Sequence, residues 1–159
     1  MKKVVMAIIL GSFLTGCAPG YVYTPPSKVE YDKTMQEAKR KDAEFAEKVK
    51  NINLDTADVG VKPKDYQSLV ESAIREGLKD PDSAKFYDFT SPRKEVMVEQ
   101  GNFVYGYSTC VYVNAKNSYG GYVGKQLYWA FIRNNQVLRV TNTAEAYGDI
   151  IFVGRPITC

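Results

Sequence analysis

The pattern of apolar residues changes near residue 84, and this change constrains the fold more than any other feature. Before it, one stretch repeats apolar residues at helical spacing: Tyr66, Leu69, Val70, Ala73, Ile74 and Leu78. After it, residues 102–114 are rich in tyrosine, valine and threonine, which is typical of a strand. Helices followed by strands predict an α+β fold, in which the amphipathic helix packs on a small antiparallel sheet.

The expected helices and strands follow from this change of pattern. We expect helices over residues 30–50 and 65–78, and strands over residues 85–90, 95–98, 102–114, 125–133, 136–141 and 150–153. Asn134 and Asn135 predict a tight hairpin turn, because asparagine tolerates the left-handed backbone conformation. The 30–50 helix is highly charged and has a narrow apolar face. It is expected to be either a stalk lying on the domain or a surface that pairs with another helix.

The N-terminus has the pattern of a secretory signal. Lys2 and Lys3 precede an apolar run, and small residues stand before Cys17. The alternative is an uncleaved membrane helix. However, a membrane span needs about twenty apolar residues, and the run over residues 4–14 is much shorter. The sequence therefore predicts that residues 1–16 are removed.

The tetrapeptide Leu14-Thr15-Gly16-Cys17 resembles the bacterial lipobox, in which the cysteine is acylated and becomes the first residue of the mature protein. This resemblance implies a lipid-anchored lipoprotein with Cys17 as the lipidation site. In lipoproteins of this class, an aspartate directly after the acylated cysteine is the usual retention signal. Ala18 stands at that position, so the sequence is compatible with sorting of the protein to the outer membrane, where its domain would face either the periplasm or the surface. We expect a signal peptide (1–16), a flexible lipidated tether (17–29), a charged helix and linker (30–62) and an α+β domain (63–159).

Charge argues against a nucleic-acid partner. Lys2 and Lys3 leave with the signal, so 19 basic residues face 18 acidic ones in the mature chain. Nucleic-acid binding needs clustered lysine and arginine that release counterions. A nucleic-acid partner is therefore not expected. The expected partners are the membrane, which the protein binds through its lipid, and an envelope protein.

The remaining cysteines, Cys110 and Cys159, are expected to form a disulfide, because the envelope is an oxidising compartment. Closing a loop of about fifty residues would stabilise the fold by roughly 4 kcal/mol in the chain-entropy model. The alternatives are two free thiols or a metal site. Zinc normally takes three or four ligands, and the chain has no histidine. We therefore expect no metal.

Catalysis that depends on imidazole is excluded by the lack of histidine. A glycosidase with two carboxylates is not excluded, but most acidic residues lie in the charged helix or in turns. Glu95, in an expected strand, and Glu99, directly after that strand, have no motif around them. The sequence predicts a protein that is not an enzyme and has no cofactor. A hydrolase, or an inhibitor of one, is a weaker possibility.

The segment 114–124 contains three glycines and two tyrosines, and it lacks the lysine pattern of a P-loop. One interpretation is an ordinary long connection between strands. The other is a binding loop that presents Asn117, Tyr119 and Tyr122 on a rigid sheet. Trp129, on the next expected strand, is assigned to the core.

Residues 65–159 resemble a domain of small proteobacterial exported proteins and lipoproteins. The similarity lies in KDPDSAKF (79–86), Cys110, NAKNSYGGYVG (114–124) and the final cysteine. That group has no established biochemical activity, so it implies no catalytic residues. The expected function is partner binding or envelope assembly. The alternative is binding of a cell-wall glycan or a small ligand.

Overall fold

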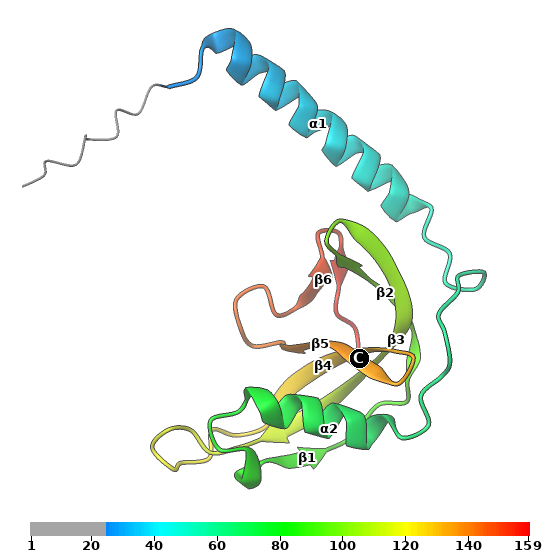
Figure 1. Ribbon diagram of the computed structural model, residues 1–159. Coiled ribbons are helices and arrows are strands. Elements are labelled where there is room, and N and C mark those ends of the chain that lie inside the picture. The colour runs from blue at the N-terminus through cyan, green and yellow to red at the C-terminus, as the bar shows by residue number, and fades with distance from the viewer. Residues whose placement is uncertain (1–24) are drawn as a thin grey trace, which may run out of the picture. The chain divides into compact units, whose positions relative to one another are not determined.

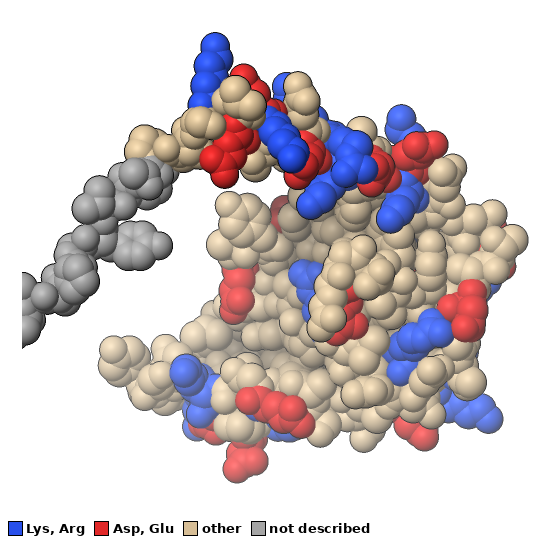
Figure 2. Space-filling view, turned by 45° about the horizontal axis from the view of Figure 1, so that its top comes forward, with Lys and Arg blue, Asp and Glu red and all other residues tan. Residues whose placement is uncertain are grey.

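The computed structural model describes residues 25–159, and the chain divides into two units, residues 1–50 and 51–159. The first unit contains α1 (Lys28–Lys50), whose residues all remain at least partly exposed (Figure 1). Ser27 caps this helix by accepting a hydrogen bond from the Glu30 amide at 3.3 Å. Basic and acidic side chains alternate along α1 (Figure 2). Cys17, the expected signal and most of the expected tether lie outside the described residues.

The second unit is an α+β domain, as the sequence predicts. Its elements in chain order are α2 (Tyr66–Gly77), the short 3₁₀ helix η1 (Pro81–Ser83), β1 (Lys85–Tyr87), β2 (Arg93–Glu99), β3 (Asn102–Asn114), β4 (Gln126–Arg133), β5 (Gln136–Asn142), β6 (Ile150–Phe152) and β7 (Arg155–Pro156). The main sheet is antiparallel, with β1, β3, β4 and β5 in order and β2 also paired to β3. β6 pairs only with β7, so it adds no edge to the main sheet.

The central strand, β3, has two short partners on one side. β1 pairs with its C-terminal end, where Lys85 lies opposite Asn114, and β2 pairs with its N-terminal part. Thr90 connects them: its amide donates to the Cys110 carbonyl at 2.9 Å, and its hydroxyl accepts from the Cys110 amide at 2.8 Å. The expected strand over residues 85–90 ends at Tyr87 because Asp88 has a left-handed backbone, with φ at 55°.

α2 packs on one face of the sheet (Figure 1). Its apolar stripe buries Val70 and Ile74, as the helical spacing predicts. The buried residues of this cluster are Val70, Ile74, Ala84, Val111, Val113, Ala115, Ala130 and Ile132. Because side chains alternate along a strand, Cys110 and Trp129 belong to the opposite face.

That opposite face is covered by the C-terminal segment, residues 150–159. Trp129 and Phe131 are fully buried, as expected for Trp129. Cys110 and Cys159 form the expected disulfide, across 49 residues of sequence. Arg139 donates to the Ile151 carbonyl at 2.8 Å. The sheet is therefore covered by a helix on one face and, on the other, by a short segment that contains the β6–β7 pair.

One local prediction is confirmed and one segment differs from expectation. Asn134 and Asn135 have φ values of 49° and 60°, as a tight hairpin turn requires. Asp80 caps η1 by accepting from the Ser83 amide at 3.3 Å. Residues 51–62, expected to be a linker, belong to the second unit, where Val59 is buried.

Candidate functional site

The predicted binding loop is a small hairpin. Lys116 and Tyr122 form an isolated antiparallel bridge. Between them, the Asn117 amide donates to the Gly121 carbonyl at 2.9 Å, and the Gly120 amide donates to the Asn117 carbonyl at 3.0 Å. Gly120 has φ at 80°, a conformation that suits glycine. We call residues 116–122 the tyrosine hairpin.

Asn117 holds the turn of this hairpin. Its side-chain oxygen accepts from the Tyr119 amide at 2.9 Å and from the Gly121 amide at 3.1 Å. An asparagine followed by a glycine-rich turn is the local signal for this arrangement. The side chain is thus engaged inside the hairpin, whereas the sequence interpretation presented it to a ligand.

Tyr119 and Tyr122 differ in their surroundings. Tyr119 is 97% exposed at the turn, and Tyr122 is 45% exposed. The Tyr122 hydroxyl donates to the Ser83 carbonyl at 3.4 Å. The ammonium groups of Lys85 and Lys116 lie 5.0 and 5.6 Å from the centre of the Tyr122 ring. Two positive charges therefore accompany this aromatic ring, one of them from the distant strand β1.

A groove of about 420 Å³ lies beside the tyrosine hairpin. Val113 and Ala115 contribute buried apolar surface, while Lys79, Lys116 and Glu145 contribute charge. The Tyr128 phenol also lines the groove. Burial raises its pKa, the negative charge of Glu145 raises it further, and a hydrogen bond with Asn142 acts in the opposite direction. Tyr128 is therefore a neutral hydroxyl at neutral pH.

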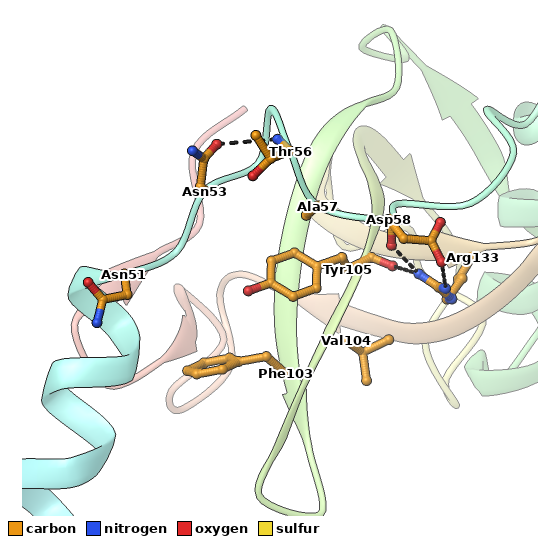
Figure 3. A pocket seen from close by; sticks show the side chains of 9 residues that line it. All are labelled: Asn51, Asn53, Thr56, Ala57, Asp58, Phe103, Val104, Tyr105 and Arg133. Atoms are coloured by element: carbon orange, nitrogen blue, oxygen red, sulfur yellow. Dashed lines mark hydrogen bonds and ion pairs between the residues drawn. The ribbon is translucent and has the colours of Figure 1, made fainter.

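A second cleft, of about 550 Å³, lies between the segment 51–58 and β3 (Figure 3). Arg133 joins these two walls. Its guanidinium donates to the carbonyls of Asp58, at 2.8 Å, and Tyr105, and it forms an ion pair with the Asp58 carboxylate at 3.0 Å. We call this the Arg133 cleft.

The Asp58 carboxylate is held in its ionised form by two neighbours. The Gly60 amide donates to it at 3.0 Å, and the Arg133 guanidinium donates to it and attracts it electrostatically. These interactions lower the pKa of Asp58 below its usual value. The charge of Asp58 and that of Arg133 therefore offset each other at neutral pH.

Glu95, which the sequence places in a strand, is buried, and its carboxylate has hydrogen-bond partners within the domain. Its carboxylate accepts from Arg155 Nε at 2.6 Å and from the Val96 amide at 2.8 Å. Arg93 lies 4.0 Å from its other oxygen. The part of the chain that the structure describes contains no group of three or more histidine, cysteine, aspartate or glutamate residues placed to hold a metal ion. The hydrogen bond from Arg155 to Glu95 connects β7 to β2.

Comparison with known proteins assigns no family to the chain. No protein family model matches it, and no curated protein or solved structure is significantly similar to it. The resemblance of residues 65–159 to small exported proteins stays a prediction. Within residues 25–159, no helix combines the length and apolar character needed to cross a membrane.

Proposed function

We propose that this protein is a non-enzymatic envelope lipoprotein, anchored through Cys17, whose α+β domain binds a protein partner through the tyrosine hairpin. The anchor is supported by the sequence around Cys17, which lies outside the described residues. The binding role is supported by the structure of the hairpin. The ion pair between the buried Glu95 carboxylate and Arg155 supports a structural role for Glu95.

The exposure of Tyr119 carries the proposal. Its ring is almost fully exposed, while Asn117 and the Gly121 amide fix the backbone around it. A fixed backbone reduces the conformational entropy that is lost on binding. Tyrosine is also among the residues that contribute most to the energy of protein interfaces. Tyr119 therefore has the properties of an anchor residue for a partner.

Charge narrows the class of partner. Lys85 and Lys116 flank Tyr122, which belongs to the same hairpin as Tyr119. Ammonium groups beside an interface favour an acidic partner surface, because complementary charges accelerate association and suppress wrong partners. The proposed partner surface is acidic and has a pocket for an aromatic ring.

Site-specific photocrosslinking tests the contact. A photoreactive residue in place of Tyr119 should yield a crosslink to one envelope protein, identified by mass spectrometry. Val153, 80% exposed on the turn between β6 and β7, is the matched control position. Crosslinks of equal yield from both positions, or none from Tyr119, would reject the hairpin as the interface.

The anchor has an independent test. Wild-type protein should incorporate labelled palmitate and fractionate with the outer membrane, whereas Cys17→Ser should do neither. Incorporation that is unchanged in Cys17→Ser would contradict lipidation at this residue.

The groove beside the hairpin favours a second candidate function, binding of a cell-wall glycan or a small ligand. Its volume of about 420 Å³ lies in the usual range for ligand sites, and it combines apolar surface with a few polar groups. In this case peptidoglycan should retain the protein in a pull-down assay, and Tyr128→Phe with Glu145→Ala, which change two residues that line the groove, should weaken retention. Equal retention of wild type and double variant would argue against it.

A further inference from the structure

The Arg133 cleft contains polar side chains that have no hydrogen-bond partner among residues 25–159. The Tyr105 hydroxyl, the Asn51 carboxamide and the Thr56 hydroxyl all line it. None of these three groups forms a hydrogen bond with another described residue. Figure 3 shows the Tyr105 ring extending from β3 toward the part of the cleft where Asn51 lies. Their hydrogen-bonding capacity is therefore available to a ligand.

Two aromatic rings lie beside these polar groups. Phe103 and Tyr105 are separated by one residue on β3, so they project to the same side of the strand. Both residues are partly exposed. The Phe152 ring lies 5.8 Å from that of Phe103, centre to centre, and helps to fix its position. The cleft thus presents two adjacent rings in defined positions.

The charges in the cleft are already compensated. Asp58 and Arg133 are its charged lining residues, and they form an ion pair with each other at 3.0 Å. The guanidinium also donates to the carbonyls of Asp58 and Tyr105. An anionic ligand would have to compete with these contacts for the guanidinium, and a cationic one would have to compete with Arg133 for the Asp58 carboxylate. The cleft therefore suits a neutral ligand.

We infer that the Arg133 cleft binds a neutral carbohydrate. A sugar ring has an apolar C–H face that packs on aromatic rings and a rim of hydroxyls that exchange hydrogen bonds with amide and hydroxyl groups. A purely apolar ligand would bury the Tyr105, Asn51 and Thr56 groups without partners, at a cost for each. The volume of about 550 Å³ is within the range of ligand sites.

This site is independent of partner binding at the tyrosine hairpin. The residues that line it come from the segment 51–58, β3 and Arg133, and none belongs to residues 116–122. A carbohydrate bound here would leave Tyr119 exposed. Failure of one proposal therefore has no bearing on the other.

Saturation-transfer NMR on the purified full-length protein tests the inference, with the trimer of N-acetylglucosamine and maltotriose as neutral probes. At least one probe should bind saturably to the wild type. Tyr105→Phe keeps the ring and removes the hydroxyl, so the dissociation constant should rise about fivefold, the usual effect of one lost hydrogen bond. Asn51→Ala should have an effect of similar size. Tyr147→Phe, at a residue that is 83% exposed and does not line the cleft, is the matched control and should leave the dissociation constant unchanged. Tyr119→Phe tests whether the sugar binds at the tyrosine hairpin instead.

Three outcomes would overturn the carbohydrate site. The first is that neither probe binds the wild type at millimolar concentration. The second is that Tyr105→Phe and Asn51→Ala bind a probe as tightly as the wild type does. The third is that Tyr119→Phe weakens binding as much as Tyr105→Phe, which would place the sugar at the hairpin.

Discussion

The two faces of the sheet are covered by different kinds of segment and held by different interactions. On one face, α2 buries Val70 and Ile74 against a continuous apolar cluster. On the other, the segment 150–159 contributes only Ile151 and Phe152 as buried apolar residues. A helix with a repeated apolar stripe can be held by burial alone, because the hydrophobic effect is non-directional. A short segment with two buried apolar residues needs bonds to particular atoms as well.

Those bonds are spread along the C-terminal segment. Arg155 donates to the buried Glu95 carboxylate, Arg93 donates to the Thr158 hydroxyl at 2.7 Å, and Cys159 is bonded to Cys110. The same face keeps two buried polar atoms, Ser108 Oγ and Trp129 Nε1, without a hydrogen-bond partner among the described residues. Specific bonds thus hold the C-terminal segment on this face, although two buried polar atoms of the face have no hydrogen-bond partner among the described residues.

The largest expected effect is that of removing the disulfide. The double variant Cys110→Ala with Cys159→Ala should lose about 4 kcal/mol of unfolding free energy, since the bond closes a long loop. Urea denaturation measures this loss. Hydrogen exchange should accelerate first in residues 150–159 and only with global unfolding in α2. Early exchange in α2 would show that the two faces are not held separately.

The next effect tests the helical face. Ile74→Ala should lose about 3 kcal/mol, because it removes a fully buried side chain from a packed cluster. The loss should add to that of the cysteine variant, since the residues lie on opposite faces of the sheet. Glu76→Ala, on the exposed side of α2, is the control and should change stability by less than about 0.5 kcal/mol. Strong non-additivity would mean that the faces are coupled.

The smallest effect compares adjacent buried hydroxyls on opposite faces. Thr109 Oγ1 donates to the Thr90 carbonyl at 2.6 Å, so Thr109→Val should lose about 1 kcal/mol. Ser108 Oγ has no partner among the described residues, so Ser108→Ala should leave stability unchanged or raise it by up to about 1 kcal/mol. Thermal denaturation of both variants decides the point. A larger loss for Ser108→Ala would indicate an ordered water bound to its hydroxyl.

Features with a local signal were predictable from the sequence. The spacing of Val70 and Ile74 predicted the buried stripe of α2, and the β-rich segment 102–114 predicted the bounds of β3. The pairing of Cys110 with Cys159 was predicted from the expected oxidising compartment and from the two cysteines that remain beside Cys17. The first two predictions rest on residue spacing or composition within a single helix or strand, and the third rests on the number of cysteines.

Features that depend on distant side chains were not predictable. Arg133 contacts Asp58 across 75 residues of sequence, and Arg155 contacts Glu95 across 60. Neither pair has a pattern that marks it. At the candidate site, the sequence indicated the tyrosine hairpin but not the placement of Lys85 beside Tyr122, which the pairing of β1 with β3 produces.

On one side, β3 pairs with two short strands, β1 and β2, and not with one long strand. This division affects how the domain interacts with other molecules. A long, regular sheet edge offers a continuous row of free peptide groups on which another chain can add a strand and begin to aggregate. Here that edge consists of three residues of β1 and seven of β2, with Pro92, which has no amide hydrogen, between them. In the proposed setting, copies of the protein share one membrane surface and collide often. An interrupted edge lets them do so without joining their sheets.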